Sequence, residues 1–353
     1  MLKVLELFAG IGACSKALKR LCIPYEIVDA VEIDKFAIKS FNAIHNTNFE
    51  IQDIKNWDKN LEVDLIIYGS PCQDFSIAGK QAGGDKGSGT RSSLLYEALR
   101  IVEKLKPKYV IWENVKNILS PKHKNNFDNC INKMEQLGYK NYYQVLNAKD
   151  FGVPQNRERV FTVSIKNEID KSFCFPEKQE LQIKLKDILE NNVEEKYFLD
   201  GKNISYLTSN DNEIKVVAKL DIKGQDVIKR VYSGEGISPT LTNMQGGNRQ
   251  PKIITAVAMR GRYSQNGNVE QKLEISNREI ANAITTVQKD SMVANEKLRI
   301  RKLTPKECWR LMGFSDHDFA KCERINSNTQ LYKQAGNSIV VNVLEAILEN
   351  LLL

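Results

Sequence analysis

A cysteine follows directly on the clearest strand ending in the sequence. Residues Val63 to Tyr68 form an apolar run that predicts a buried strand, and Gly69-Ser70-Pro71 ends that strand immediately before Cys72. The carboxyl ends of strands in an open α/β sheet are where such folds usually carry out chemistry. A thiolate is a strong nucleophile near neutral pH, so Cys72 is a candidate for covalent catalysis. Taken alone, it could equally be a small buried residue beside a glycine-rich linker.

Acidic and basic residues also occur where predicted strands begin or end. Glu113-Asn114-Val115 follows the apolar stretch Lys108 to Trp112, and residues Gln155 to Arg159 separate the predicted strands Tyr142 to Ala148 and Val160 to Ile165. A parallel sheet would bring these groups to the edge that carries the cysteine, where they could transfer protons and stabilise negative charge. Considered singly, the glutamate could cap the following turn, and the arginines could form surface ion pairs.

The N-terminal region has the pattern of a nucleoside-binding turn. An apolar strand, Leu2 to Leu7, leads into Phe8-Ala9-Gly10-Ile11-Gly12 and then into a predicted helix. Such a turn allows a ligand to approach the backbone at a helix N-terminus. Glu32 lies 20 residues after Gly12 at the end of the next strand, where a carboxylate can accept bonds from ribose hydroxyls. Two glycines instead of three weaken a dinucleotide interpretation and leave room for S-adenosylmethionine; a purely structural turn is the alternative.

Composition limits the class of protein. No apolar run reaches the ~18 residues of a membrane span, so we expect no membrane association. The seven cysteines are scattered without a C-x-x-C pair, which indicates reduced thiols and a cytoplasmic location. Three histidines, far apart, argue against a metal site.

The positive charge is concentrated in one internal block. The net charge is +7, and residues Lys215 to Lys302 hold 16 Lys and Arg against 8 Asp and Glu, while the rest of the chain is nearly balanced. A basic block of this kind suits contact with a phosphate backbone. A solvated, lysine-rich surface would give the same count.

The order of predicted elements indicates two parts. Residues 1–165 alternate strands and helices, which favours an α/β fold with a mostly parallel sheet and helices on both faces. Helical periodicity fades between Lys186 and Asn295, which predicts a smaller, strand-rich domain. Helices return after Leu298, and a capping pattern at Thr304 to Glu307 predicts a helix start. We therefore predict a catalytic domain at 1–176, a small domain at 177–316 with a variable region at about 186–298, and a return segment at 317–353.

Five motifs in this order resemble those of the DNA (cytosine-5) methyltransferases of bacterial and phage modification systems. They are the turn at Phe8 to Gly12, Pro71-Cys72-Gln73, Glu113-Asn114-Val115, Gln155 to Arg159, and Gly336-Asn337-Ser338. The resemblance covers about residues 1–165 and 298–353, and the basic block falls where that family places its target-recognition region. It implies a Rossmann-like sheet that binds S-adenosylmethionine, with S-adenosylhomocysteine as product and no metal.

The resemblance assigns catalytic roles. Cys72 would add to carbon 6 of cytosine, Glu113 would protonate N3 and hold the exocyclic amine, and Arg159 would bind O2 with Arg157 supporting the site. No residue stands out as the base that removes the carbon 5 proton, and water could serve. The glycine-rich loop after Cys72 would close over DNA once the target base has left the stack. The resemblance further implies a cofactor pocket formed by Phe8, Gly10, Gly12, Glu32, Ile33, Asp53, Ile54, Pro71, Leu94, Asn337 and Ser338.

Candidate DNA contacts come from the loop after Cys72 and from the basic block. Thr240-Leu241-Thr242 matches the Thr-Leu dipeptide of recognition regions, and Gly246-Gly247 would let the backbone approach a groove. Residues 237–245 and 280–288 also resemble each other, as a duplicated hairpin or by chance. The full set of predicted DNA-binding residues is Ser76, Lys80, Gln225, Thr240, Thr242, Gly246, Gly247, Arg249, Arg260 and Arg262.

The sequence thus predicts a monomeric enzyme that flips and methylates cytosine at carbon 5 in a specific double-stranded DNA sequence, in restriction-modification or phage DNA protection. A cognate restriction endonuclease would act separately. An RNA (tRNA) cytosine-5 methyltransferase of the same fold and a non-catalytic DNA-binding relative are the alternatives. A nicotinamide-dependent oxidoreductase would account for Gly10, Gly12 and Glu32 and for nothing after residue 60.

Overall fold

The computed structural model describes residues 1–71, 91–199, 204–206, 213–263, 269–276 and 299–353. The predicted nucleophile Cys72, the predicted DNA contacts Ser76 and Lys80, the glycine-rich loop and the second copy of the possible repeat lie outside these residues.

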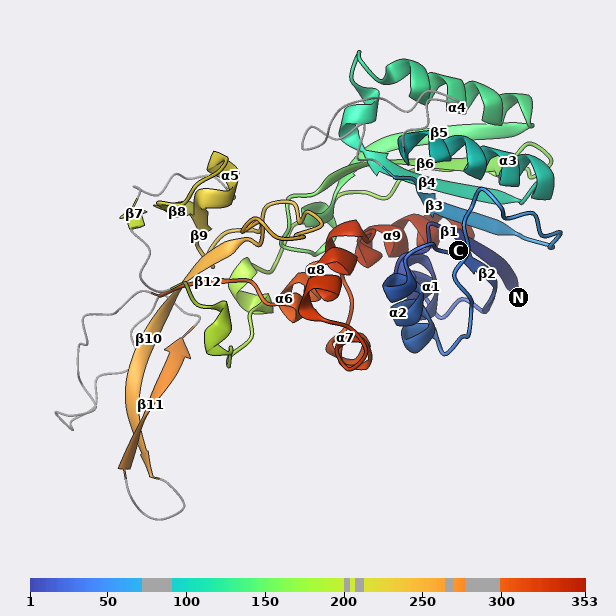
Figure 1. The fold of residues 1–353 in the computed structure, drawn as a ribbon. Helices are drawn as coiled ribbons and strands as arrows, with labels where there is room; N and C mark the ends of the chain where they lie inside the picture. Colours follow the sequence, from blue (N-terminus) through green and yellow to red (C-terminus); the bar gives the residue numbers. More distant parts are fainter. Residues whose placement is uncertain (72–90, 200–203, 207–212, 264–268, 277–298) are drawn as a thin grey trace.

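The larger part of the fold is a six-stranded sheet in the order β2-β1-β3-β4-β6-β5 (Figure 1). Neighbouring strands among the first four are parallel, whereas β6 is antiparallel to both of its neighbours. The prediction of a mostly parallel sheet is confirmed. The strand bounds are β1 Leu2–Leu7, β2 Tyr25–Val31, β3 Leu65–Gly69, β4 Tyr109–Val115, β5 Tyr139–Asn147 and β6 Glu158–Lys166.

Helices cover both faces of this sheet because each strand alternates its apolar side chains between two cores. Val4 packs in a buried cluster with α1 and α9, and its neighbour Leu5 packs in a second cluster with α3 and α4. The helices are α1 Ala13–Arg20, α2 Lys35–His45, α3 Leu95–Leu105, α4 Lys124–Gln136 and α9 Val341–Leu352. Short 3₁₀ turns occupy Arg91–Leu94, Lys116–Leu119, Ala148–Phe151, Leu185–Ile188 and Glu195–Tyr197.

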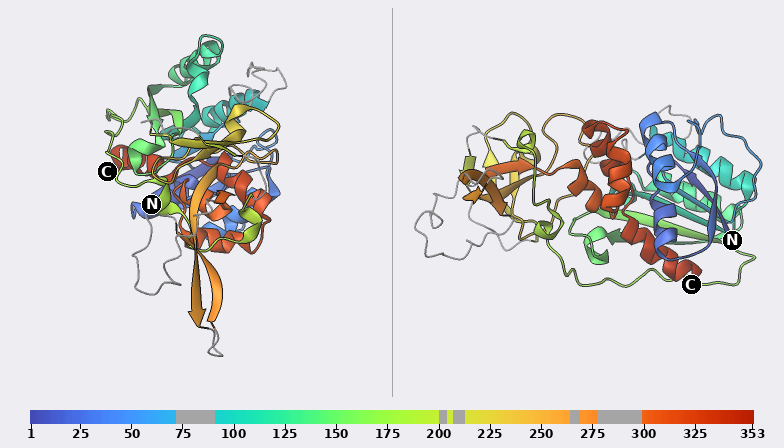
Figure 2. Two further views of the ribbon diagram at one scale, coloured as in Figure 1. Left: turned by 90° about the vertical axis from the view of Figure 1, so that its left-hand side faces the viewer. Right: turned by 90° about the horizontal axis from the view of Figure 1, so that it is seen from below.

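A second sheet stands to one side of the first (Figures 1 and 2). Its strands follow the order β11-β10-β9-β8-β7, and β12 also pairs with β10. Arg260 and Arg262 lie on β10. A helical turn, α5 Asp226–Lys229, directly precedes β9, which begins at Arg230. The bounds are β7 Ile204–Tyr206, β8 Val216–Leu220, β9 Arg230–Tyr232, β10 Lys252–Tyr263, β11 Val269–Ser276 and β12 Arg299–Lys302.

Three helices lead from the second sheet back to the first: α6 Pro305–Arg310, α7 Asp316–Glu323 and α8 Asn328–Asn337. The predicted helix start is confirmed, since the Thr304 hydroxyl accepts from the Glu307 amide and the Glu307 carboxylate accepts from the Thr304 amide. Trp309 and Leu241 share one buried cluster with the first sheet. Both residues lie within the predicted small domain and yet pack with the first sheet, so the predicted limits of that domain, 177 and 316, stay predictions.

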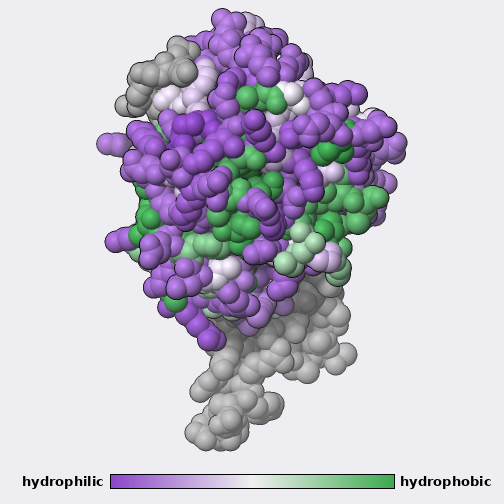
Figure 3. Space-filling view, turned by 90° about the vertical axis from the view of Figure 1, so that its right-hand side faces the viewer, coloured by the Kyte–Doolittle hydropathy of each residue, from purple (hydrophilic) through white to green (hydrophobic). Residues whose placement is uncertain are grey.

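One described segment, Asn328–Leu352, has the length and apolar composition of a membrane-spanning helix. Half of its most apolar window is buried inside the protein, and residues 338–340 divide the segment into α8 and α9. The buried side of α9 packs against α1 in the core, and a core helix passes the same test as a membrane span. The side of the molecule that carries the two chain termini in Figure 1 is mainly hydrophilic and has a few hydrophobic patches (Figure 3).

Candidate active site

A glutamate and an arginine form an ion pair at one edge of the first sheet. Glu113 lies on β4 beside Gly69 of β3, and its Oε1 atom lies 3.0 Å from Nε of Arg159. Arg159 belongs to the first residues of β6 and pairs in register with Val115. Because β6 runs antiparallel, its beginning meets the carboxyl end of β4. The predicted convergence of Glu113 and Arg159 is therefore observed, and the reversed direction of β6 produces it.

This ion pair is not an open surface pair. The Glu113 and Arg159 side chains are 11% and 16% exposed. A Cβ atom at Gly69 would lie 3.3 Å from Oε2 of Glu113, so the second carboxylate oxygen faces the end of β3. Glycine at this position leaves room for the carboxylate close to the point where the chain continues toward Cys72.

The residue two positions before Cys72 is fixed by the neighbouring strand. The Ser70 hydroxyl is buried and accepts hydrogen bonds from Nε1 of Trp112 and Nδ2 of Asn114, both at 3.0 Å. Two side chains of β4 thus hold the end of β3 in place. Sequence reasoning missed this role of Ser70 and Asn114, although the position of Asn114 next to Glu113 in the motif was a usable signal.

The guanidinium of Arg157 lies among main-chain carbonyls. It is 4% exposed and donates to the carbonyl oxygens of Leu241, Gly336 and Ser338 at 2.9, 3.2 and 2.9 Å. The sequence assigned this residue a supporting role at the catalytic centre. The structure places its side chain in the contact between three chain segments.

The turn after β1 adopts the backbone conformation that its glycines allow. Phe8, Gly10 and Gly12 have positive φ angles of 50°, 56° and 80°. A Cβ atom at Gly12 would lie 2.1 Å from Nε2 of His45, so position 12 requires glycine for space as well as for conformation. The turn therefore presents its backbone at the start of α1, as the motif predicts.

The carboxylate of Glu32 fixes this turn to the end of β2. It accepts hydrogen bonds from the amides of Gly10 at 2.9 Å and Asp34 at 2.8 Å. Burial raises the pKa of Glu32, and the two amide bonds oppose this effect. Ile33, beside it, is exposed.

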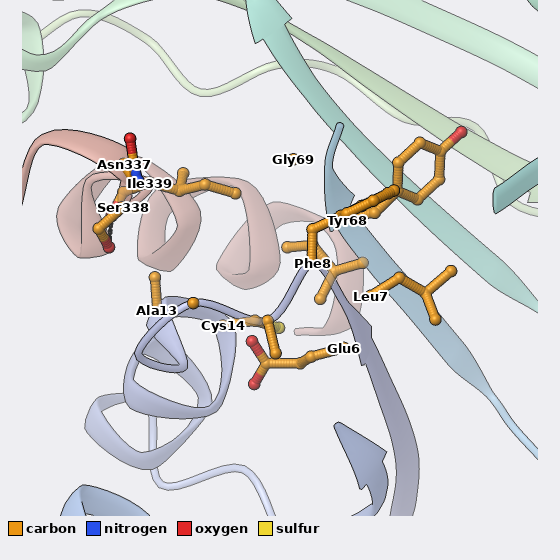
Figure 4. A pocket seen from close by; sticks show the side chains of 13 residues that line it. Glu6, Leu7, Phe8, Ala13, Cys14, Tyr68, Gly69, Asn337, Ser338 and Ile339 are labelled. Carbon is orange, nitrogen blue, oxygen red and sulfur yellow. Dashed lines mark hydrogen bonds between the residues drawn. The ribbon is translucent and has the colours of Figure 1, made fainter. Parts of the chain in front are cut away.

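A pocket opens between this turn, the end of β3 and the turn that joins α8 to α9 (Figure 4). Phe8, Gly10, Asn337 and Ser338 line it, together with Gly69, whose neighbour in register is Glu113. These four predicted cofactor residues are therefore brought together next to the ion pair. The other predicted cofactor residues do not line this pocket: Gly12, Glu32, Ile33, Asp53, Ile54, Pro71 and Leu94.

The loop that carries Asp53 and Ile54 is held at the end of β2 by a buried aspartate. Asp29 accepts hydrogen bonds from Gln52 Nε2, Trp57 Nε1 and Lys59 Nζ, each at 2.8 Å. Although burial alone would raise the pKa of Asp29, these bonds hold it below its usual value. The adenine-binding role of Asp53 stays a prediction.

A carboxylate in the pocket lining was missed by sequence reasoning. Glu6 on β1 is 4% exposed, and its Oε1 accepts from the Ser15 amide at 3.0 Å. Burial raises the pKa of Glu6 to about 7. Figure 4 shows the carboxylate directed toward the start of α1. A single glutamate inside the apolar strand Leu2–Leu7 was the signal that could have identified it.

The predicted DNA contacts lie in two places. Gln225, before α5, is exposed. The others described with side chains follow β9: Thr240, Thr242, Gly246, Gly247 and Arg249, all exposed. Four successive or near-successive residues here have positive φ angles, namely Met244, Gly246, Gly247 and Asn248. This tight loop, residues 244–248, is called the recognition loop below.

The recognition loop is anchored from beneath by a buried lysine. Nζ of Lys252 donates to the carbonyl oxygens of Asn248 and Gln250, and burial lowers the pKa of Lys252 to about 8. The loop backbone is thus fixed while the Arg249 side chain stays exposed.

Among the described residues, no group of three or more His, Cys, Asp or Glu side chains is placed to hold a metal ion.

The α/β sheet, its cofactor-type turn and the ion pair at the strand ends define a protein of the methyltransferase fold. Solved structures of Dnmt2 methyltransferases share this fold. The protein from S. pombe matches with a TM-score of 0.65 and 18% identity over 100% of both chains. A Spodoptera frugiperda DNMT2 mutant matches with a TM-score of 0.66 and 21% identity over 99% of both chains.

The sequence model of the family described as C-5 cytosine-specific DNA methylase matches residues 2–352. The chain is 35% identical to the orphan methyltransferase M.SPBetaI of Bacillus phage SPbeta, over 99% of this chain and 97% of the relative. It is 34% identical to the type II methyltransferase M2.ScrFI of Lactococcus lactis subsp. cremoris, over 99% of both. The chain therefore belongs to the C-5 cytosine-specific DNA methylase family, and it is a DNA cytosine methyltransferase. The family resemblance and the enzyme class predicted from the sequence are confirmed.

Proposed function

We propose that this enzyme transfers a methyl group from S-adenosylmethionine to carbon 5 of cytosine within a specific sequence of double-stranded DNA. The observation that carries the proposal is the Glu113–Arg159 pair, which lies next to Gly69. Gly69 lines the pocket and precedes Cys72 by three residues in the sequence. The family supplies the substrate class, and this arrangement supplies the groups that the reaction needs.

The residues of the pocket, and the Glu32 carboxylate that holds the turn from outside the pocket lining, fit the proposed cofactor. The left-handed turn at Phe8 to Gly10 leaves its backbone close to the pocket, and no side chain at position 10 obstructs it. The Glu32 carboxylate uses one oxygen for each of two amides, and each oxygen keeps lone pairs that can accept from ribose hydroxyls. S-adenosylmethionine, when bound there, would supply a methyl group on a positively charged sulfur.

The chain's own groups activate the cytosine. The Cys72 thiolate adds to carbon 6, and the electron pair displaced from the carbon 5–carbon 6 bond moves into the ring. Glu113 donates a proton to N3 and accepts from the exocyclic amine, while the Arg159 guanidinium donates to O2. Carbon 5, now electron-rich, would bond to the methyl group as the methyl–sulfur bond breaks and S-adenosylhomocysteine leaves. A base, which water could be, then removes the carbon 5 proton, the sulfur–carbon 6 bond breaks to release the thiolate, and the N3 proton returns to Glu113, which restores the ring.

The target base must leave the duplex to reach Cys72, because carbon 6 of a stacked cytosine is inaccessible to a side chain. The second sheet and the recognition loop would contact the DNA, and the glycine-rich loop after Cys72 would close over the site. Orphan phage methyltransferases and type II methyltransferases both occur among the relatives. We therefore place the enzyme in phage DNA protection or restriction-modification, acting as a monomer, with any restriction endonuclease separate.

A trapped adduct tests this mechanism. Replacing hydrogen by fluorine at carbon 5 of the target cytosine blocks the proton removal that releases the thiolate. With the recognised duplex and S-adenosylmethionine, the protein should then form a covalent complex, visible by denaturing electrophoresis and mass spectrometry, with the attachment at Cys72. Cys72→Ser should form none. Attachment at another residue, or full turnover by Cys72→Ser, would refute the mechanism.

A further inference from the structure

Two side chains of the Gln155-x-Arg157 motif satisfy both main-chain groups of Leu241. Oε1 of Gln155 accepts from the Leu241 amide at 3.1 Å, and Nη1 of Arg157 donates to the Leu241 carbonyl at 2.9 Å. Both side chains are buried, at 0% and 4% exposure. These two side chains make the hydrogen bonds to Leu241 that the main chain of a neighbouring strand would make. They hold the segment around Leu241 next to the start of β6, where Ser238 also pairs with Gln155 in an isolated β-bridge.

The surrounding residues extend this contact. The Ser238 amide donates to the Pro154 carbonyl at 2.8 Å, and the Asn156 amide donates to the Ser238 carbonyl at 2.8 Å. The Thr240 hydroxyl donates to the Asn156 carbonyl at 2.6 Å. Residues 238–243, called the docking segment below, are thus fixed to the catalytic sheet immediately before the recognition loop. The hydroxyl of Thr240, a predicted DNA contact, is already engaged within the protein.

The same guanidinium binds a wall of the cofactor pocket. Nη2 of Arg157 donates to the carbonyls of Gly336 and Ser338, at the end of α8. Ser338 lines the pocket. One planar group with five donors therefore joins the catalytic sheet, the docking segment and the pocket wall. Arg159, two residues further along, forms the ion pair with Glu113.

A glycine permits the close contact between the docking segment and α8. A Cβ atom at Gly336 would lie 1.9 Å from the carbonyl oxygen of Thr242 and 2.7 Å from Cα of Asn243. Both obstacles are backbone atoms, so no side-chain movement could accommodate even an alanine. Gly336 is the penultimate residue of α8, and the close approach of the Thr242 backbone accounts for glycine at this position.

We propose that Arg157 is a positioning residue that fixes the docking segment and the cofactor-pocket wall in one arrangement, so that cofactor and DNA strengthen each other's binding. This inference rests on the proposed function, because it takes the recognition loop to contact DNA and the pocket to hold S-adenosylmethionine. The coupling is reciprocal. A cofactor that orders the turn at Ser338 also orders the docking segment through Arg157. DNA held by the recognition loop orders the docking segment and, through Arg157, the turn at Ser338.

The test measures the coupling itself. The dissociation constant of S-adenosylhomocysteine is determined by calorimetry with and without the recognised duplex, alongside kcat and KM for DNA. In the unaltered enzyme the duplex should tighten S-adenosylhomocysteine binding at least tenfold. In Arg157→Lys the tightening should fall below threefold and KM for DNA should rise at least tenfold, because an ammonium cannot bridge three carbonyls in the guanidinium geometry. Binding of S-adenosylhomocysteine without DNA should weaken no more than threefold.

Two further variants separate positioning from general stability. Gly336→Ala displaces the docking segment while keeping Arg157, and it should lose the coupling in the same way. Arg20→Lys is the matched control: Arg20 also binds a main-chain carbonyl, that of Gly313, but contacts neither the docking segment nor the pocket. It should lower the melting temperature without changing the coupling.

The inference would be overturned by Arg157→Lys with undiminished tightening and an unchanged KM for DNA. It would also be overturned if the duplex left S-adenosylhomocysteine binding unchanged in the unaltered enzyme. Failure of the proposed function is a distinct result, since an enzyme that binds both ligands but transfers no methyl group to the duplex would contradict that function alone.

Discussion

The same pair of residue types, arginine and glutamate, is used differently in two regions of the molecule. At the edge of the first sheet, Arg159 and Glu113 keep 16% and 11% of their side-chain surface exposed beside the pocket. Where β12 turns into α6, Arg301 and Glu307 are both 0% exposed and form two hydrogen bonds of 2.8 and 2.7 Å. The amides of Glu190 and Thr304 occupy the remaining lone pairs of that carboxylate.

The difference indicates that the Glu113–Arg159 pair is available for chemistry, whereas the Glu307–Arg301 pair stabilises the fold. A carboxylate whose acceptor positions are all filled cannot bind a substrate, whereas Glu113 has Oε2 directed at the glycine that ends β3. Changes at the sheet edge should therefore remove activity and leave the fold, and changes at the β12–α6 corner should do the opposite. The predictions that follow test this contrast.

Glu113→Gln should give the largest effect. The amide keeps the shape of the side chain but cannot donate a proton to N3, so we expect kcat to fall roughly 10²- to 10⁴-fold. S-adenosylhomocysteine binding and the melting temperature should change little. The measurement is single-turnover methyl transfer to duplex DNA, with calorimetry on the same preparation. A variant that retains most of its kcat would remove Glu113 from the mechanism.

Arg301→Met should chiefly affect stability. Removing one member of a fully buried pair leaves the Glu307 charge without its partner, which costs about 3–5 kcal/mol of unfolding free energy. The double variant Arg301→Met, Glu307→Leu should recover much of that loss, because it removes the uncompensated charge. Denaturant unfolding measures both. Equal stability of the single and double variants would show that the corner pair does not behave as a buried pair.

Gly12→Ala and Gly138→Ala form a matched pair. The φ angles are 80° at Gly12 and 85° at Gly138. A Cβ atom at position 12 would clash with the His45 side chain, whereas a Cβ atom at position 138 would have nothing within 4 Å. Both variants should lose about 1–2 kcal/mol from backbone strain. Gly12→Ala should lose about 1–3 kcal/mol more from the clash and should weaken cofactor binding. Equal losses in the two variants would contradict the packing of His45 against the turn.

A further prediction concerns pH and the buried glutamate in the pocket lining. Burial raises the pKa of Glu6 to about 7, above the ~4.3 of an unfolded chain. The folded state therefore holds the proton more tightly, and stability from this group falls by up to about 1.4 kcal/mol per pH unit between about pH 4.5 and 7, then levels off. Glu6→Gln should gain on the unaltered protein over that range.

The comparison isolates Glu6 from other titrating groups. Burial also lowers the pKa of His45 to about 4, which removes stability as the pH falls below about 6.5, but this contribution is present in both proteins and cancels in the difference. The measurement is the unfolding free energy of both proteins from pH 4.5 to 8. A constant difference across that range would contradict the assigned pKa of Glu6.

Much of the catalytic sheet could be predicted from periodicity, because each strand is an apolar run next to a turn or helix signal. By the same criterion Asn48 to Ile51 would be a short strand, but these residues form none. The Asn42 side chain accepts from the Phe49 amide and donates to its carbonyl, so it replaces a neighbouring strand. Glu113 and Arg159 were placed at strand ends, whereas the structure includes them in β4 and β6.

The contacts around Arg157 could not be predicted in the same way. They join residues 84, 179 and 181 positions apart through side chains that bind main-chain atoms, and such contacts leave no periodic trace in a sequence. The Gly336-Asn337-Ser338 motif precedes an apolar run, Ile339 to Leu353, and from the sequence alone would open the last helix, whereas Gly336 belongs to α8 and the last helix begins at Val341. The reason for its glycine is the backbone of Thr242, which sequence neighbours do not reveal.

The central claim is that this chain methylates carbon 5 of cytosine in DNA through Cys72. The most direct test is to express it in a host without cytosine methylation and to combine mass spectrometry of the nucleosides with bisulfite sequencing. We expect 5-methylcytosine in DNA at one recurring sequence context, and none with Cys72→Ser. Methylation confined to RNA, a methyl group on N4 in place of carbon 5, or undiminished 5-methylcytosine with Cys72→Ser would contradict the claim.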